Sequence, residues 1–403
     1  MTAIAHAKLG DIAQYLRGIN FKPDDVTSVG APGTVACMRT KNIQDSLDCS
    51  DVWGVAETFV RRTEQILQEG DMLVSSANSW NLVGKCCWIP HLPWKTTFGG
   101  FVSALRANPM RVNQRYLYWW FSSDRTQALL RSFGRKTTSI SNLSAEQCLN
   151  LSVPLPPLPE QRRIAAILDQ ADALRTKRRE ALAQLDSLTQ SIFIEMFGDP
   201  VTNPFHWPSM TLGSVASKFS DGPFGSNLKS EHYVDAGVRV IRLQNIGVNE
   251  FVDKDKAYVS ERHFESIKKH ECRPGDVLVG TMGDPNLRAC LLPETVGLAI
   301  NKADCVQIRV ADRVANSTFL CGLLNHPSTL QLAQDLMHGQ TRVRISMGGL
   351  RGLAVPVPPL PLQQTFATRI QSVEALKATH RAALAELETL FTSLQHRAFR
   401  GEL

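Results

Sequence analysis

The chain is built from one scaffold that occurs twice, about 200 residues apart. The proline-rich run VPLPPLP at 153–159 recurs 202 residues later as VPVPPLP at 355–361. A repeat constrains the fold strongly, because each copy has to form its own supersecondary unit and bury its own core. Four further matches keep the same order at shifts of 202 to 205: LGDIA at 9–13 with LGSVA at 212–216, RTKNI at 39–43 with RLQNI at 242–246, GDMLV at 70–74 with GDVLV at 275–279, and 134–141 with 339–346.

Between these landmarks the two copies differ strongly. The first carries GINFKP at 18–23, and the second carries DGPFGSNLK at 221–229. Two interpretations are open at this point: an old duplication whose loops have drifted, or two related modules that each recognise something different.

The element pattern predicts an α/β chain, more narrowly α+β, in which two globular halves alternate with two long helices. Short β-rich runs such as 238–241 and 276–279 follow turn residues, and helical patterns such as 114–121 and 317–324 lie between them. A helix-length stretch without Pro or Gly follows each proline run, at 160–197 and 362–400, and GDP at 198–200 ends the first. The expected domains are 1–157, 158–199, 200–359 and 360–403.

A heptad-like pattern in both helices predicts that they pair as a coiled coil. Antiparallel pairing would relate the two halves by a pseudo-twofold axis, although parallel packing also fits the pattern. The polar interruptions, Arg178 and His380, fall at matching places and either set the register or mark a gap in the seam. The expected seam is Ala171, Leu174, Arg178, Ala181, Leu185, Leu188 and Ile192 in the first helix, and Val373, Leu376, His380, Ala383, Leu387, Leu390 and Leu394 in the second.

Composition indicates a globular protein of a reducing compartment. Nine cysteines are an odd number, and no Cys-x-x-Cys occurs; Cys86 and Cys87 with His91 come nearest to a ligand cluster but lack a second pair. We therefore expect reduced thiols, no metal site, and a cytoplasmic location, since neither a signal peptide nor a membrane span is evident. The net charge of +6 suits a polyanion partner, and its surplus lies in the globular halves.

No signature of catalysis stands out along the chain. A Walker-type phosphate loop, the cofactor loop and Asn-Pro-Pro-Tyr/Phe motif of adenine methyltransferases, and a nuclease-like acidic constellation are all missing from the sequence. The fragment NPF at 203–205 lies in a proline-rich linker and is interpreted as a turn. The sequence therefore favours a binding protein.

The chain resembles the specificity subunits of type I restriction–modification systems over nearly its whole length. The resemblance rests on PLPPLPEQRRIA at 154–165, IFIEMFGD at 192–199 and the segment 221–229. It implies two target-recognition domains that each read half of a bipartite double-stranded DNA site. It also implies that the helices set the spacer and dock two modification subunits. Leu362 stands where the first helix has Glu160, which weakens the first-turn contact with the helix dipole.

The same resemblance implies where the chemistry of the complex resides. The modification subunits bind S-adenosylmethionine and methylate adenine at N6, and motor–nuclease restriction subunits use ATP and Mg. This chain itself would hold no cofactor and perform no catalysis. Two alternatives remain: a stand-alone DNA-binding or coiled-coil scaffold protein without a restriction role, and a fused methyltransferase or nuclease chain with unfamiliar motifs.

Candidate DNA contacts follow from the hydrogen-bonding chemistry of the side chains. Arginine pairs with guanine and asparagine or glutamine with adenine in the major groove, whereas Lys and Arg also neutralise phosphates. Residues common to both modules are expected to be phosphate or scaffold contacts, and the differing Lys41 and Gln244 are expected to contact bases. The full candidate set is Arg39, Lys41, Asn42, Arg135, Lys136, Ser226, Lys229, Arg242, Gln244, Asn245, Arg342 and Arg344.

Two other clusters are expected to be structural. The aromatic patch of Tyr116, Tyr118, Trp119 and Trp120 lies in a helical pattern, so core packing is favoured over base contact. The run 268–270, KKH, is interpreted as an exposed basic face.

Overall fold

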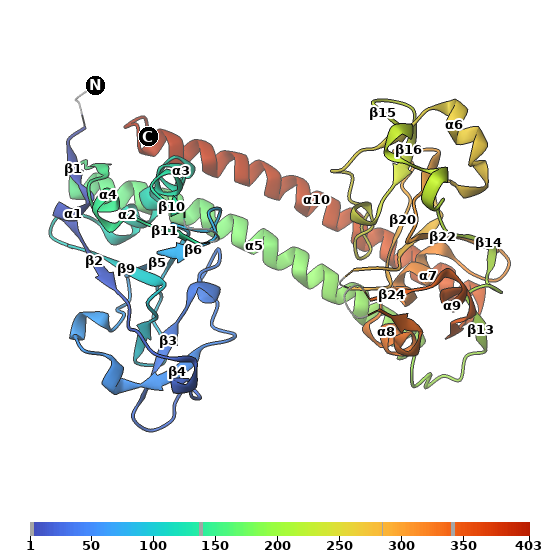
Figure 1. Ribbon diagram of the computed structural model, residues 1–403, viewed down its shortest axis with the longest axis horizontal. Helices are drawn as coiled ribbons and strands as arrows, with labels where there is room; N and C mark the ends of the chain where they lie inside the picture. Colours follow the sequence, from blue (N-terminus) through green and yellow to red (C-terminus); the bar gives the residue numbers. More distant parts are fainter. Residues whose placement is uncertain (1–3, 137–139, 284, 340–342) are drawn as a thin grey trace. The chain divides into compact units, whose positions relative to one another are not determined.

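The computed structural model describes residues 4–136, 140–283, 285–339 and 343–403, which form two compact units (Figure 1). Unit 1 comprises Met1–Arg178 with Ala383–Leu403, and unit 2 comprises Arg179–Ala382. Each unit therefore contains one globular half together with part of both long helices.

The elements of the first half, through the first long helix, begin close to the N-terminus. They are β1 (His6–Lys8), α1 (Leu9–Ile12), β2 (Ala13–Arg17), η1 (Pro23–Asp25), β3 (Thr34–Met38), η2 (Thr40–Asn42), β4 (Trp53–Ala56), η3 (Glu57–Phe59), η4 (Thr63–Gln65), β5 (Met72–Ser75), β6 (Ala77–Asn78), β7 (Cys86–Trp88), β8 (Thr96–Phe98), β9 (Val102–Ala107), α2 (Gln114–Phe121), α3 (Asp124–Ser132), β10 (Arg135–Lys136), β11 (Ser141–Asn142), α4 (Ala145–Leu149), β12 (Ser152–Pro154) and α5 (Leu158–Phe197).

The second half repeats this order with small additions. Its elements are β13 (Ser209–Thr211), β14 (Ala216–Ser220), η5 (Gly225–Asn227), η6 (Ser230–His232), β15 (Tyr233–Val234), β16 (Val238–Ile241), η7 (Leu243–Asn245), β17 (Tyr258–Val259), α6 (Glu261–Ser266), η8 (Lys268–His270), β18 (Glu271–Cys272), β19 (Val277–Gly280), β20 (Arg288–Leu291), β21 (Ala299–Asn301), β22 (Cys305–Val310), α7 (Ser317–Leu324), α8 (Pro327–Leu332), η9 (Gln334–Leu336), β23 (Met337–His338), β24 (Arg344–Ile345), α9 (Met347–Gly352), β25 (Ala354–Pro356) and α10 (Leu360–Ala398).

Both halves contain the same two sheets. One is a four-stranded antiparallel sheet, β2-β9-β5-β7 in the first half and β14-β22-β19-β20 in the second. The other includes one parallel pair, β3 with β8 in the first half and β16 with β21 in the second. The second half adds β15 and β18 at the edges of this sheet. The repeat predicted from the sequence is therefore a repeat of topology.

Helix α2 shows how each half builds its core. Asn113 caps the helix by accepting a hydrogen bond from the backbone N–H of Tyr116, as its residue type favours. The hydroxyl of Tyr116 donates to the carbonyl of Pro154 at 2.8 Å, so this buried polar group is satisfied. Tyr118, Trp119 and Trp120 are also buried. The prediction that the aromatic patch belongs to the core is confirmed.

The two long helices pack against each other within each unit, and the contacts run antiparallel. In unit 1 the guanidinium of Arg163 donates to the carbonyl of Leu403, and that of Arg175 lies over the ring of Phe391. In unit 2 Lys377 bonds Asp186, and Arg369 lies 3.6 Å from Glu195. Later residues of α5 thus meet earlier residues of α10, and the predicted pair of long helices is confirmed.

The contact face of the helices differs from the expected seam at four leucines, whereas Ala181 and Ala383, which share their heptad position, are half-buried. Leu174, Leu188, Leu376 and Leu390 are 44–54% exposed. The inward side chains are instead those one residue later, among them Arg175 over Phe391 in unit 1 and Lys377 against Thr189 in unit 2. The other seam positions follow the expectation more closely: Ala171, Ile192 and Val373 are buried, Leu185, Leu387 and His380 are half-buried, and Arg178 is exposed.

The nine cysteines carry free thiols, of which only that of Cys49 belongs to an exposed residue. Burial raises the pKa of Cys37 and of Cys87 to about 12, so both stay protonated at neutral pH. Across the part of the chain that the structure describes, no helix is both long and apolar enough to cross a membrane.

Candidate nucleic-acid interface

The turn after β3 and the turn after β16 are built in the same way. Asn42 accepts a hydrogen bond from the N–H of Arg39 at 2.7 Å and donates to the carbonyls of Asp48 and Asp51. Asn245 likewise accepts from the N–H of Arg242 and donates to two carbonyls of the following loop. Both side chains are at most 1% exposed. They hold the turns in shape, and neither amide is available to read an adenine.

In each module, one aspartate carboxylate contacts the two other residues of the turn that were expected to bind DNA: Arg39 and Lys41 in module 1, the first globular half, and Arg242 and Gln244 in module 2, the second globular half. In module 1, Asp51 lies 3.0 Å from Arg39 and 2.7 Å from Lys41. These hydrogen bonds, first from Lys41 and then from Arg39, lower the pKa of Asp51. The guanidinium of Arg39 also lies 3.6 Å from the ring centroid of Trp53.

Module 2 repeats the arrangement with Gln244 in place of Lys41. Asp255 forms an ion pair with Arg242 and accepts a hydrogen bond from the amide of Gln244. The two modules therefore share an arginine, an asparagine and a carboxylate, while the two residues between the arginine and the asparagine differ; the second of them is Lys41 in module 1 and Gln244 in module 2. Lys41 is the more exposed member of its pair, with 59% of its side chain accessible.

A second loop lies beside this turn in each module. In module 2 the guanidinium of Arg288 donates to the carbonyls of Leu243 and Ile246 on the turn, and to those of Met282 and Pro285 on the loop after β19. In module 1 the matching residue, Lys85, bonds the amide of Gln44 at 3.0 Å. The first residue of β20 and the residue before β7 thus tie the turn to the rest of the surface.

The residue just before β9 in module 1 and just before β22 in module 2 lies at the tip of a loop, and it also differs between the modules. Phe101 occupies this tip in module 1 and is 66% exposed; its carbonyl accepts from the N–H groups of Ser76 and Ala77. Asp304 occupies it in module 2, where its carbonyl accepts from the N–H of Thr281 and its carboxylate lies 4.0 Å from Arg344. An exposed aromatic side chain and an ion-paired aspartate at one scaffold position make this tip a second variable site.

The structure describes the other residues that were expected to contact DNA only in part. Arg344 is exposed on β24, and Arg135 and Lys136 form β10, although their side chains lie outside the described residues, as does Arg342. Ser226 and Lys229 are exposed on and after η5, and Lys229 lies 3.6 Å from Glu231. Among the contacts of the described residues, none joins Ser226 or Lys229 to Gln244 or Arg344.

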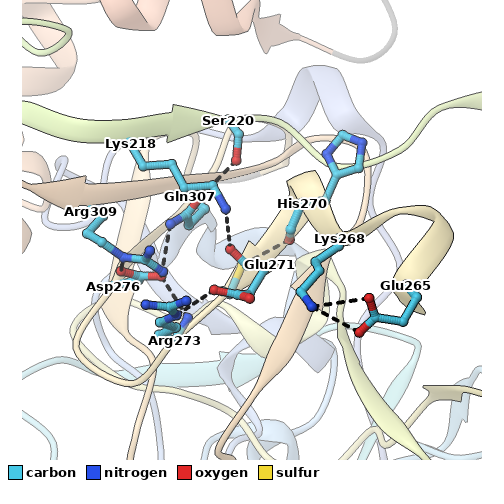
Figure 2. A network of polar contacts seen from close by, with 11 residues as sticks. Lys218, Ser220, Glu265, Lys268, His270, Glu271, Arg273, Asp276, Gln307 and Arg309 are labelled. Carbon is cyan, nitrogen blue, oxygen red and sulfur yellow. Dashed lines mark hydrogen bonds and ion pairs between the residues drawn. The ribbon is translucent and has the colours of Figure 1, made fainter. Parts of the chain in front are cut away.

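A buried polar network supports the four-stranded sheet in module 2 (Figure 2). Asp276 accepts two hydrogen bonds of 2.8 Å from Arg309, one of 2.9 Å from Gln307 and one of 2.7 Å from the N–H of Arg273. Module 1 has the matching pair of Asp71 and Arg106. The shared Gly-Asp of the repeat is therefore a scaffold feature. Lys268, from the run expected to be an exposed face, bonds Glu265 at the surface.

Sequence reasoning missed several members of this surface, among them Asp51, Asp255, Phe101, Asp304 and Arg288. Asp51 and Asp255 lie 9 and 10 residues after the shared asparagines, so no common spacing marks them. Phe101 was hidden because a single aromatic residue beside two glycines carries no periodic signal. Within the described residues, no group of three or more His, Cys, Asp or Glu side chains is placed to hold a metal ion.

The fold and this surface define a class of protein: two copies of one recognition scaffold with different decoration, each packed on paired helices. Comparison with known proteins shows which proteins the chain is similar to. Residues 5–184 match the family described as the type I restriction modification DNA specificity domain. The chain is 22% identical to the StySPI specificity subunit of Salmonella potsdam, over 99% of this chain and 89% of that protein. It is also 22% identical to the EcoKI specificity subunit of Escherichia coli K12, over 98% and 88%.

Solved structures show the same fold. The specificity subunit from M. genitalium aligns with 99% of this chain and 97% of its own length, at a TM-score of 0.57 and 14% identity. A chain from a structural study of type I restriction–modification complex assembly covers 100% and 99%, with a TM-score of 0.56 and 19% identity. The resemblance inferred from the sequence is confirmed: over nearly its whole length the chain is similar to the specificity subunits of type I restriction–modification systems.

Proposed function

We propose that this chain recognises a bipartite DNA site, with each module reading one half, and that it performs no catalysis itself. The observation that carries the proposal is the repeated turn, in which an arginine, an asparagine and a carboxylate stay the same while Lys41 is exchanged for Gln244. Two modules that read different bases need the same scaffold with different hydrogen-bonding side chains at the DNA-facing position.

The common arginines serve a sequence-independent role in this proposal. Arg39 and Arg242 each lie against a carboxylate, and a DNA phosphate can compete for the same guanidinium. Lys41 would donate to guanine O6 or N7, and Gln244 would pair with adenine N6 and N7. Phe101 and Asp304 at the second variable site would add contacts that differ between the half-sites.

We further propose that two modification subunits dock on the paired helices, one on each unit. Leu174 and Leu390 are exposed in unit 1, and Leu188 and Leu376 are exposed in unit 2. They share one heptad position, so each unit presents leucines beside its helix seam. Exposed apolar side chains arranged in this way suit additional helices from a partner.

The cofactors would belong to those partners. The modification subunits would supply S-adenosylmethionine for methylation of adenine at N6, and restriction subunits would supply ATP and Mg for motor and nuclease activity. The fully protonated buried thiols suit the reducing cytoplasm in which such a complex would work.

The test is to co-express the chain with its neighbouring methyltransferase gene and to map N6-methyladenine across the host genome. The expected result is methylation at one bipartite motif, which disappears when this chain is omitted. Lys41→Ala should relax only one half of the motif, and Gln244→Ala only the other. Lys268→Ala, which removes an exposed lysine paired with Glu265, is the matched control and should leave the motif unchanged.

The outcomes separate this proposal from its alternatives. Methylation that is unchanged without the chain refutes the specificity role and favours a scaffold. Methylation by the chain alone, without the partner gene, would indicate a fused enzyme. Relaxation of both half-sites by a single substitution would contradict the assignment of one module to each half.

A further inference from the structure

An aromatic stack fills the space between helix α2 and the long helices in unit 1. The guanidinium of Arg115 lies 4.7, 5.0 and 4.8 Å from the ring centroids of Trp88, Tyr118 and Trp119. The indole N–H of Trp119 donates to Asp169 at 2.8 Å, and Asp169 also binds Arg115. The ring of Phe391 closes the stack 5.3 Å from Trp119. This side of unit 1 is therefore filled by the chain itself.

The internal repeat identifies the matching residues of unit 2 without ambiguity. The N–H of Asn113 donates to Gln161, and the N–H of Asn316 donates to Gln363, each at 2.8 Å, so α2 and α7 are in register on their long helices. At every position of the stack, unit 2 has a smaller residue. The pairs are Trp88 with Leu291, Arg115 with Thr318, Tyr118 with Cys321, Trp119 with Gly322, and Phe391 with Thr189.

These five smaller residues all line an open groove of about 540 Å³ in unit 2. Part of the lost volume is replaced from the core side, since a Cβ on Gly322 would lie 3.2 Å from the ring of Phe366 and 3.4 Å from that of Phe193. Both phenylalanines are buried, so the core of unit 2 is complete beneath the groove. The groove therefore corresponds to the outer part of the space that the aromatic stack fills in unit 1, and the smaller side chains of unit 2 leave it open.

The polar lining restricts what can occupy the groove. It includes the neutral side chains of Asn249, Asn316, Gln364 and Gln371, and its charged group is Glu374, which already bonds Lys377 at 2.8 Å. Among the described residues that line it, none is Lys, Arg or His. The neighbouring Lys377 is 3% exposed and paired with Asp186 and Glu374, so a phosphate group would find no accessible cation among them, and a nucleic acid or nucleotide is a poor occupant. Neutral acceptors around an apolar floor instead suit an aromatic ring with an N–H or O–H donor.

We propose that this groove is a docking site for a protein segment that inserts a tryptophan or tyrosine side chain. The filled counterpart in unit 1 shows that this scaffold accommodates such rings between the same elements, and Gln371 occupies the place of Asp169, the acceptor of the Trp119 N–H. Because unit 1 is filled, the segment binds once per chain. This distinguishes it from any partner that uses the surfaces repeated in both units, and the proposal does not depend on DNA recognition.

The test uses the full chain and the peptide acetyl-Ala-(5-fluorotryptophan)-Ala-amide, observed by ¹⁹F NMR. Saturable line broadening and shift are expected for the wild type. Leu291→Trp with Cys321→Tyr refills the groove with the residues of unit 1, and binding should be lost. Leu298→Trp adds the same indole at a 44% exposed site away from the groove and is the matched control, which should bind as the wild type does.

A second variant keeps the test decisive if the refilled chain does not fold. Gln371→Asp alters an exposed residue and restores the carboxylate acceptor found in unit 1. Charge-assisted hydrogen bonds are about twice as strong as neutral ones, so binding should tighten about fivefold. The absence of saturable binding to the wild type, binding that persists in the refilled variant, or an unchanged affinity of Gln371→Asp would each overturn the proposal.

Discussion

Replacing Asp276 by asparagine should destabilise unit 2 severely, because this carboxylate is the centre of a buried network. It is 3% exposed and accepts four hydrogen bonds, two of them from Arg309 (Figure 2). Asparagine keeps the shape but removes the charge and turns one acceptor oxygen into a donor. The guanidinium of Arg309 would then lie against an NH₂ group.

The magnitude follows from the burial of both partners. Breaking a buried ion pair by removing one charge costs about 3–5 kcal/mol. Arg309 is 28% exposed, so water can compensate part of its loss, and the lower end of about 3 kcal/mol is expected. For a unit of roughly 200 residues, each kcal/mol lowers the Tm by about 2–4 °C. The expected shift is therefore about 6–12 °C in the transition of unit 2.

Differential scanning calorimetry of the full chain measures this shift, and two variants calibrate it. Glu265→Gln breaks the ion pair with Lys268, whose side chains are 61% and 55% exposed, and should lower the free energy of unfolding by less than about 1 kcal/mol. Asp71→Asn breaks the matching bidentate pair with Arg106 and should lower the transition of unit 1 by a similar amount. A shift for Asp276→Asn no larger than that for Glu265→Gln would refute the reasoning.

Three further predictions concern unit 2. Burial lowers the pKa of His326, whose Nδ1 accepts from the N–H of Ser328 at 3.2 Å; the stability it contributes is present above about pH 6.5 and lost as the pH falls below that value. Asparagine also caps helices, so the Tm of His326→Asn should fall less than that of the wild type between pH 7.5 and 5.5. Lys377→Met should leave the Tm unchanged or raise it, because it replaces a 3% exposed cation by an apolar side chain of similar volume, whereas Lys377→Ala should lower it. Leu188→Glu with Leu376→Glu should reduce the number of modification subunits bound per chain from two to one in native mass spectrometry, and an unchanged stoichiometry would contradict the proposed docking surface.

The sequence predicted the repeat, the two helices and the core aromatics because each has a local physical cause. Proline runs precede the helices, and the structure begins them at Leu158 and Leu360, two residues before the stretches without Pro or Gly. The shared asparagines at 42 and 245 could be recognised as common to both modules, and their complete burial gives the reason. These features depend on neighbouring residues and on composition, which a single sequence contains.

What could not be predicted depends on contacts between distant residues. Asp51 and Asp255 return to the turns through loops of different length, so no spacing reveals them. The groove in unit 2 becomes visible only when α2 and α7 are placed in register, since Gly322 and Thr318 read alone are ordinary helix residues. Both features arise where the two copies differ, and the sequence pattern that revealed the repeat is least informative there.

The helix seam shows the same limit most clearly. Choosing apolar residues selects the leucines at 174, 188, 376 and 390, but the structure turns inward the residues that follow them, of which Arg175, Thr189 and Lys377 are polar and Phe391 is apolar. Long Arg and Lys stems can pack in such a seam while their charged ends reach a partner, as Arg175 does over Phe391 and Lys377 does with Asp186. Two helices alone would gain free energy by burying the leucines instead. The leucines that stay exposed in both units are the apolar surface on which we propose that partner helices dock.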